Sequence, residues 1–184
     1  MKNYTKFITT VIILTVVSLA IKGQTNVSGG IYANTTWTLA NSPYIVTDTV
    51  VVFPNVTLTI EPGVVVKFDS TKFLDVRGTI SAVGTQTDSI TFTSSSANPS
   101  VGSWRGILSW SQNSIDIEYC NLYYADTALF IGTGIISHAK FQNNSIGILS
   151  GYIINIDSCL FLYNRPLAKL NIFKIINSRY QIHS

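Results

Sequence analysis

Asp116 and Glu118 come closest in this sequence to a catalytic pair of carboxylates. They occupy alternate positions of an expected strand, and alternate residues of a strand point to the same side. We therefore expect both carboxylates to face one way, an arrangement that can divide acid and base roles between two groups. The simpler alternative, which we favour, is an ordinary solvated strand face, where most acidic side chains lie.

The histidines and cysteines give no second constellation. His138 is expected to point outward from a strand, and His183 lies close to the last residue. Neither has the neighbours of a metal site or a catalytic triad. Cys120 and Cys159 are expected to be small buried hydrophobic residues, too far apart for a disulfide. The sequence therefore predicts no catalytic residue, no metal and no cofactor.

Aromatic residues beside a basic residue form the other candidate site. Trp104 and Trp110 follow a loop rich in Ser, Asn, Pro and Gly at 95–103, and Arg105 lies between them. In one interpretation these three side chains bind a glycan, with the indole rings stacked on sugar rings. In the other, which we favour, the tryptophans pack at the base of the loop or fill the wide end of a coil.

A repeat supplies the elements that must position these residues. Leu58, Leu74 and Ile90 are each sixteen residues apart, and each begins an apolar, polar, apolar triplet. This alternation is strand periodicity, and its recurrence indicates a repeat fold. The spacing predicts coils that each hold two short strands and two turns, stacked about 4.8 Å apart with like residues over like. The expected fold class is all-β, a right-handed parallel β-helix.

The second half of the chain has a longer repeat. Isoleucines at 117, 136, 156 and 176 are nineteen, twenty and twenty residues apart. The same spacing predicts one column holding Cys120, Ala139 and Cys159, and another holding Leu122, Phe141 and Phe161. Asn144 and Asn164 also correspond, which predicts a ladder of side-chain amides between coils. In the last coil this register puts Arg179 and Gln181 at the two inward positions, so we expect an incomplete stack.

The amino terminus resembles a secretory signal. Two lysines precede an uncharged run at 7–21 that is short for a membrane span, which predicts a cleaved signal peptide at 1–23. Of the 12 Lys and Arg residues three lie there, so the mature chain carries nine against nine Asp and Glu. This balance gives no basis for binding nucleic acid. We expect an irregular cap and first strand at 24–53, then β-helix coils at 54–184.

Several segments resemble the opening coils of secreted bacterial β-helix proteins. They are Trp37-Thr38-Leu39, Ser42-Pro43-Tyr44, Leu58 to Phe68 with its Glu61-Pro62-Gly63 corner, Val76 to Ile80, Ile90 to Ser94, and Trp104-Arg105-Gly106-Ile107. The resemblance is to right-handed, pectin-lyase-like β-helix proteins of Bacteroidetes. It implies export, and the resembled proteins commonly continue with further coils and a carboxy-terminal domain for type IX secretion. We therefore expect this chain to be part of a longer product or of an assembly.

The resemblance also frames the expected function. A polysaccharide lyase should show clustered carboxylates for calcium, and a glycoside hydrolase paired aspartates on neighbouring coils. The acidic residues are instead spread one or two per coil. We expect a non-enzymatic, secreted or surface scaffold that acts in adhesion or binds polysaccharide. The alternatives are the remnant of a lyase or hydrolase, and a purely structural stalk.

Four short motifs resemble the O-glycosylation signal of exported Bacteroidetes proteins. Each places an Asp before Ser or Thr, and the predicted acceptors are Thr49, Ser70, Ser89 and Thr127.

Overall fold

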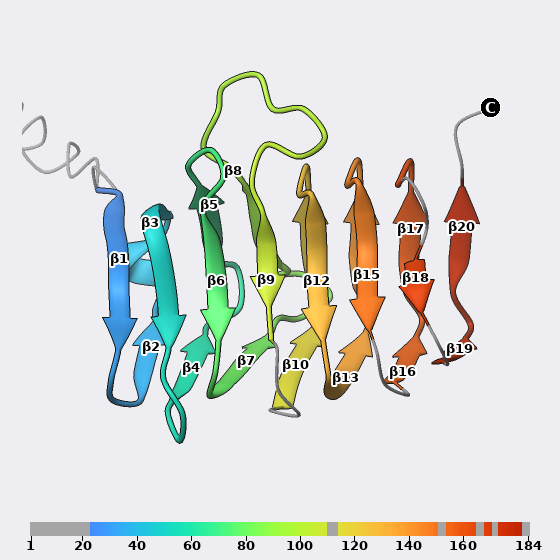
Figure 1. Ribbon diagram of the computed structural model, residues 1–184, viewed down its shortest axis with the longest axis horizontal. Coiled ribbons are helices and arrows are strands. Elements are labelled where there is room, and N and C mark those ends of the chain that lie inside the picture. Colours follow the sequence, from blue (N-terminus) through green and yellow to red (C-terminus); the bar gives the residue numbers. More distant parts are fainter. Residues whose placement is uncertain (1–22, 110–113, 151–153, 165–167, 171–172, 182–184) are drawn as a thin grey trace, which may run out of the picture.

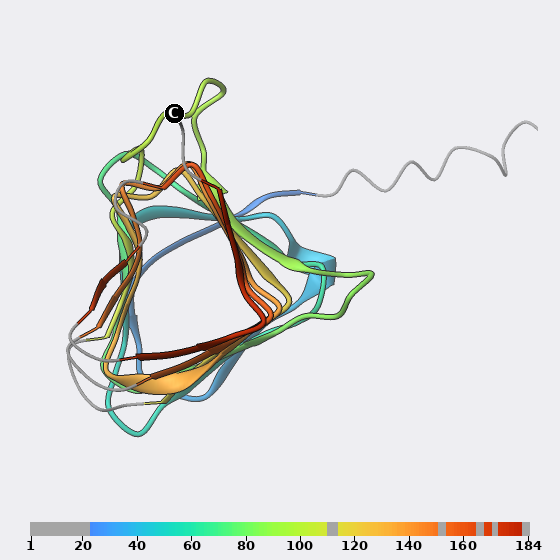
Figure 2. The same ribbon diagram turned by 90° about the vertical axis from the view of Figure 1, so that its right-hand side faces the viewer.

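The computed structural model describes residues 23–109, 114–150, 154–164, 168–170 and 173–181. The predicted signal peptide at 1–23 lies outside this part of the chain except for Gly23, and so do Trp110 and His183. Within these residues twenty strands and one 3-10 helix follow one another, and every strand pairing is parallel. The strands wind into a solenoid, seen from the side in Figure 1 and along its axis in Figure 2. The expected all-β parallel β-helix is confirmed.

The solenoid has a triangular cross-section with three strand stacks, which we call the first, second and third faces (Figure 2). β1 (Thr25–Ile31) and β3 (Tyr44–Val52) are long enough to run along both the first and the second face. The first face continues with β5 (Val65–Phe68), β8 (Ile90–Ser94), β11 (Cys120–Tyr123), β14 (Lys140–Gln142), β17 (Leu160–Leu162) and β20 (Arg179–Gln181). The second face continues with β6 (Phe73–Val76), β9 (Gly106–Leu108), β12 (Thr127–Ile131), β15 (Ile146–Ser150) and β18 (Ala168–Leu170). The third face holds β2 (Thr35–Trp37), β4 (Thr57–Ile60), β7 (Thr79–Val83), β10 (Ser114–Glu118), β13 (Thr133–Ser137), β16 (Ile154–Asp157) and β19 (Phe173–Ile176).

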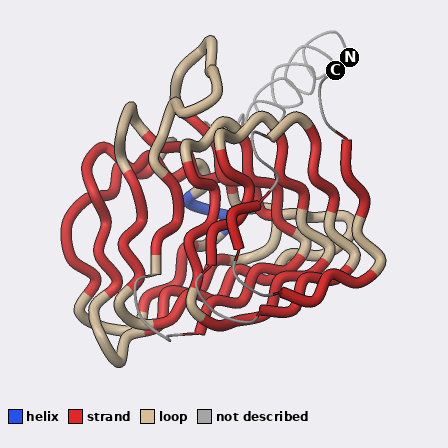
Figure 3. Tube along the Cα trace, turned by 45° about the vertical axis from the view of Figure 1, so that its right-hand side comes forward, coloured by secondary structure: helices blue, strands red, loops and turns tan. Residues whose placement is uncertain are grey.

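Residues 24–42, for which the sequence predicts an irregular cap, already contain two strands of the solenoid. β1 pairs with β3, and β2 pairs with β4. The single turn of 3-10 helix η1 (Leu39–Asn41), the helix in Figure 3, follows β2. Its first backbone N–H, at Leu39, donates to the Glu61 carboxylate at 2.8 Å. The first coil is therefore built like the others, with a small helical turn at one corner.

The predicted sixteen-residue coil with two strands is wrong. Leu58, Leu74 and Ile90 do not stack on one another, because β4, β6 and β8 belong to three different faces. Leu58 instead pairs with Ile80, 22 residues later. The true unit is one strand with its turn, about eight residues long, and three such units make a coil. Sixteen is two of these units, which is why the apolar triplet recurs at that spacing without marking a coil.

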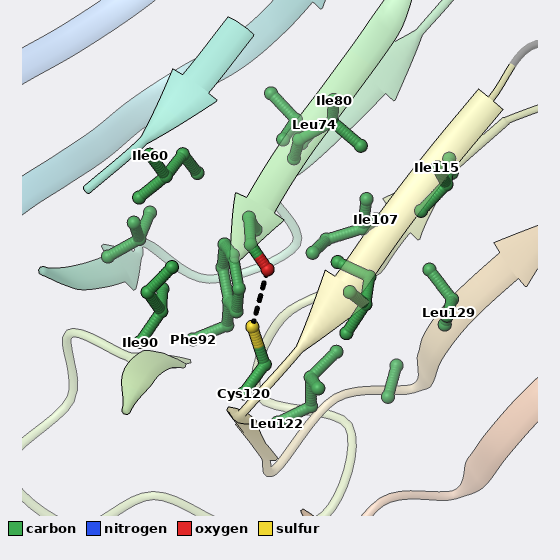
Figure 4. Close-up of a cluster of buried hydrophobic side chains, with 14 of the residues drawn as sticks. Ile60, Leu74, Ile80, Ile90, Phe92, Ile107, Ile115, Cys120, Leu122 and Leu129 are labelled. Atoms are coloured by element: carbon green, nitrogen blue, oxygen red, sulfur yellow. Dashed lines mark hydrogen bonds between the residues drawn. The ribbon is translucent and has the colours of Figure 1, made fainter. Parts of the chain in front are cut away.

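The core is a set of apolar columns that run along the solenoid axis. One column on the first face passes through Leu122, Phe141 and Phe161, as predicted. The rings of Phe141 and Phe161 stack with centroids 4.9 Å apart and planes 7° apart. Figure 4 shows the middle of this core, where the Cys120 thiol lies among isoleucines and leucines and donates to the Ala82 carbonyl oxygen at 3.2 Å. Both cysteines are buried and free, as the sequence predicts.

The Asn144 and Asn164 ladder is confirmed. Both side chains are buried, and the Asn144 amide donates to the Asn164 side-chain oxygen at 2.9 Å. Each amide also donates to a carbonyl oxygen of the previous coil, at Leu122 and Phe141 respectively. The Asn144 oxygen accepts the backbone N–H of Ala125 at 2.8 Å. The ladder thus supplies partners to buried backbone groups at the corner between the first and second faces.

The predicted register of the last coil is wrong by one residue. The columns of Ile117, Ile136 and Ile156 align as expected, but Ile156 then pairs with Ile175 rather than with Ile176. Likewise Arg179 pairs with Leu160 and is exposed, and Tyr180 pairs with Phe161. A spacing of nineteen residues keeps the charged Arg179 out of the inward column, which is the favourable register because side chains alternate between faces.

Candidate functional site

The candidate site lies where the first face turns into the second, beside the largest surface loop. This loop, residues 95–105, leaves after β8 and returns at β9; it is the tall yellow-green loop in Figure 1. Its base is joined to the next coil by backbone hydrogen bonds. Thr127 N–H donates to the Arg105 carbonyl at 3.0 Å, and Ser103 N–H donates to the Tyr124 carbonyl at 2.9 Å. We call this region, residues 103–108 and 123–130, the loop corner.

Gly106 allows the two coils to approach each other at the loop corner. Its φ is +138°, a conformation that side chains disfavour, and a Cβ placed there would lie 1.8 Å from the Thr127 carbonyl oxygen. Only glycine therefore fits this position of the Trp104-Arg105-Gly106 sequence. The close approach sets Arg105 next to Asp126 and Thr127 on the surface.

Trp104 is not part of that surface. Its side chain is fully buried and its ring stacks on Phe68, with centroids 4.1 Å apart and planes 10° apart. The indole N–H donates to the Tyr123 carbonyl at 2.7 Å. No ring face is left for a sugar, so the glycan-binding interpretation of Trp104 is wrong and the packing alternative describes it. Large rings bury most area inside the coil, at the base of the loop.

A shallow hollow of about 190 Å³ opens on the second face at the loop corner. It is lined by Arg105, Leu108, Asp126, Thr127, Phe130 and Leu149. Leu108, Phe130 and Leu149 follow one another in register on β9, β12 and β15, so they form an apolar row along the axis. The hollow brings the predicted glycan-binding residue Arg105 and the predicted O-glycosylation site Thr127 together. A glycan on Thr127 would compete with any ligand for this space.

Among the residues that the structure describes, the two charged groups of the hollow have no ion-pair partner. Both Arg105 and Asp126 are exposed, and the ion pairs among the described residues involve other side chains. The Arg105 guanidinium lies over the Phe73 ring, 4.8 Å from its centroid, which orients the cation without neutralising it. The hollow therefore offers a ligand one cationic hydrogen-bond donor, Arg105, and one carboxylate acceptor, Asp126. The apolar row of Leu108, Phe130 and Leu149 lines the same hollow.

Two tyrosines on the neighbouring side of the loop corner are not predicted by the sequence. Tyr123 and Tyr124 are partly exposed, with ring centroids 6.4 Å apart in an edge arrangement. The Lys140 ammonium lies 5.6 Å from the Tyr123 ring centroid. Partial burial, reinforced by Tyr124, raises the pKa of the Tyr123 hydroxyl. The available signal was their position after Leu122, where strand alternation turns Tyr123 outward.

The predicted carboxylate pair stands on the third face, away from the loop corner. Asp116 and Glu118 alternate with the buried Ile115 and Ile117 of β10, so both face outward as expected. A Glu118 carboxylate oxygen lies 3.7 Å from Nδ1 of His138. His138 is exposed, as predicted, but it occupies the turn after β13, with φ +50°, rather than a strand, and stacks on Tyr119.

Among the described residues, no three His, Cys, Asp or Glu side chains gather as a metal site. Asp75 is the one acidic side chain that is almost fully buried, with 9% of it exposed. One of its oxygens accepts from Arg77 at 2.8 Å, whereas Oδ1 has no hydrogen-bond partner. This group belongs to an ion pair on the second face, one coil before the hollow.

The remaining O-glycosylation predictions concern scattered surface positions. Ser70 is exposed in the turn between β5 and β6, whereas Thr49 and Ser89 are partly buried. A second hollow, of about 350 Å³, lies at the first coil and is lined by residues of β1 and β2 together with Val50. It holds no predicted site residue.

Comparison with known proteins agrees with this geometry. The family described as "Pectate-lyase like beta helix domain" matches residues 29–125, which is more than half of the chain. The chain belongs to this family. The matched part of this pectate-lyase-like β-helix domain runs from β1 to the loop corner and includes Arg105 and Gly106.

A curated relative is similar over a shorter stretch. "Protein bark beetle" of Drosophila melanogaster is 44% identical over 57 residues, which are 31% of this chain and 2% of that protein. The chain thus matches only a small part of that relative's length. No solved structure matches the chain. In the part of the chain that the structure describes, no helix has the length and apolar character needed to cross a membrane.

Proposed function

We propose that this pectate-lyase-like β-helix domain is a non-enzymatic binding scaffold that holds a polysaccharide or cell-surface glycan at the loop corner. The observation that carries the proposal is the hollow, where Arg105 and Asp126, which form no ion pair with a described residue, line one surface with Phe130 and Leu149. Polar groups that fix hydroxyls beside an apolar patch are what a sugar ring requires. Tyr123 adds a partly exposed aromatic ring to the first-face side of the loop corner.

The scattered acidic groups support a binding role over catalysis. Asp126 lines the hollow, but Asp116 and Glu118 lie on a different face and Asp75 is occupied by Arg77. Acid–base cleavage of a glycosidic bond requires two carboxyl groups facing each other across one sugar. The composition of the predicted signal peptide supports a further part of the proposal, that the chain is exported and acts outside the cell or at its surface.

Affinity electrophoresis through gels that contain single polysaccharides tests the proposal. We expect the protein to be retarded by at least one neutral or acidic polysaccharide. Phe130→Ala and Arg105→Ala should abolish the retardation, because they remove the apolar contact and the cation of the hollow. Ile135→Ala is the matched control, because Ile135 is 60% exposed on the third face. Free passage through every gel, or equal loss with Ile135→Ala, would contradict the proposal.

The alternative is that the chain is the remnant of a polysaccharide lyase or glycoside hydrolase, and the family's description as pectate-lyase like supports the lyase. In that case the purified protein, or a longer product that contains it, should release unsaturated or reducing sugars from a uronate polymer. Turnover by this chain that survives Phe130→Ala but is lost with Asp116→Asn or Glu118→Gln would reverse the ranking of the two functions.

A further inference from the structure

The charges around the hollow bear on which glycan it would take. Arg105 alone would favour an acidic sugar, because a guanidinium binds a carboxylate well. Asp126 lines the same hollow, and neither group is neutralised by another described side chain. The net charge that a ligand meets there is therefore close to zero. A carboxylate that approached Arg105 would also approach Asp126, and this repulsion offsets the attraction.

Uncharged hydroxyls satisfy both groups at once. A sugar hydroxyl can donate to the Asp126 carboxylate and accept from the Arg105 guanidinium, whereas a carboxylate can only accept. A hydrogen bond in which one partner is ionised is roughly twice as strong as one between two neutral groups. The hollow therefore suits a ligand that carries neighbouring donors and acceptors.

Size and apolar lining narrow the ligand further. The volume of about 190 Å³ is below the roughly 300–1,000 Å³ of pockets for drug-sized ligands. It therefore accommodates one ring-sized group rather than a whole oligomer. Phe130 and Leu149 line it together, and Leu108 continues the same row. The C–H face of a hexose ring can lie on such a row while its hydroxyls turn toward the charged groups.

We infer that the hollow selects a single neutral hexose unit of a glycan and discriminates against uronic acids. This inference rests on the proposed glycan-binding function and adds the ligand class. In it Asp126 accepts from two hydroxyls, Arg105 donates to the ring substituents, and Phe130 carries the apolar face. Asp126 is then the specificity-determining residue, because its charge both binds the neutral sugar and repels the acidic one.

Isothermal titration of the full chain with matched oligosaccharides tests this inference. The probes are hexasaccharides of glucose, mannose and galactose, and a hexasaccharide of galacturonic acid. We expect at least one neutral probe to bind about tenfold or more tightly than the uronate. Asp126→Asn should weaken the neutral probe and strengthen the uronate, each about tenfold or more. Glu118→Gln, the same change on the third face, should alter neither affinity.

The outcomes separate the inference from the function on which it rests. Tighter binding of the uronate, lost with Arg105→Ala and unchanged by Asp126→Asn, would overturn the neutral-sugar inference and leave glycan binding intact. Absence of heat with all four probes, together with free passage in the affinity gels, would overturn both. Binding that survives both Phe130→Ala and Arg105→Ala would place the sugar elsewhere and likewise overturn both.

Discussion

The ring of Trp104 lies flat on the ring of Phe68, with 4.1 Å between centroids, although β6, β7, β8 and the loop residues 95–103 all lie between the two residues in the sequence. This contact closes the base of the surface loop onto the core. It explains why a tryptophan that follows a polar loop is buried, and it leaves Arg105, the next residue, exposed at the loop corner. The stack of Trp104 on Phe68 therefore both buries Trp104 and fixes the position of the candidate site beside it.

Trp104→Ala should destabilise the protein strongly. The change removes the stack on Phe68 and the hydrogen bond to the Tyr123 carbonyl, and it leaves a cavity in a close-packed coil. We expect the free energy of unfolding in urea to fall by about 3–5 kcal/mol. Val101→Ala, in the exposed part of the same loop, should change it by less than about 0.5 kcal/mol. A small loss with Trp104→Ala would contradict the buried position.

Asn144→Ala should also be destabilising, for a different reason. The side-chain amide of Asn144 donates to the Leu122 carbonyl oxygen and to the Asn164 side-chain oxygen, and its own side-chain oxygen accepts the Ala125 backbone N–H. All of these groups lie in a buried corner. Its removal leaves those groups without partners, so urea unfolding should show a loss of about 2–4 kcal/mol. Gln142→Ala, two residues away on the outward side of the strand, is the control and should be nearly neutral. Equal effects of the two changes would argue against the ladder.

Gly106→Ala and Gly102→Ala form a matched pair at the two ends of one loop segment. Both glycines have positive φ, but a Cβ at Gly102 meets open space whereas one at Gly106 meets the Thr127 carbonyl oxygen. We expect Gly102→Ala to lower the free energy of unfolding by about 1 kcal/mol and Gly106→Ala by about 3 kcal/mol or more. Gly106→Ala should also weaken glycan binding, since the loop corner must shift. If both variants lose the same free energy of unfolding, the positive φ alone accounts for the loss, and the close contact with Thr127 does not contribute.

The buried thiols should make stability fall in alkaline solution. Burial raises the pKa of the Cys159 thiol from its ordinary 9.0 to about 11, and the pKa of Cys120 is raised by the same cause. Between pH 9 and 11 the unfolded chain releases thiol protons that the folded chain keeps. The free energy of unfolding should therefore decline as pH rises through this window, by up to about 1.4 kcal/mol per pH unit for each thiol.

Urea unfolding at a series of pH values measures this decline. In the double variant Cys120→Ala, Cys159→Ala the slope contributed by the thiols should disappear. A slope that is identical in the variant would show that other groups, such as tyrosines and lysines, account for the alkaline loss.

The fold class and the coil length of the second half could be predicted, because inward apolar residues recur there at the coil spacing, but the coil length of the first half could not. Inward residues recur every eight residues at Leu58, Val66, Leu74, Ala82 and Ile90, all of them fully buried. Coils of two or of three such units both fit this pattern, and the pairing of Leu58 with Ile80 shows that three strands complete a coil, here in 22 residues because one turn is shorter. The asparagine ladder was predictable because Asn144 and Asn164 repeat at the coil length of their own region.

The candidate site could be predicted only in part. Arg105 was identified from its aromatic neighbours, although Trp104 turned out to serve the core. Asp126 was not predicted as a site residue, because its place in the hollow with Arg105 depends on how the next coil stacks against the loop. That stacking is fixed by long-range pairing and by the close approach at Gly106, which local patterns do not reveal. Residues that lie together on this surface are far apart in the sequence, so local sequence patterns could not identify them as one site.

Chemical-shift mapping of the isotope-labelled protein during titration with the best-retained oligosaccharide tests the central claim most directly. We predict that the shifted amide signals cluster at the loop corner, among Arg105, Asp126, Thr127, Phe130 and Leu149. Signals of the third face, such as those of Glu118 and Ile135, should stay in place. Shifts confined to the third face, or an unchanged spectrum at saturating sugar, would contradict the claim that this corner is the binding surface.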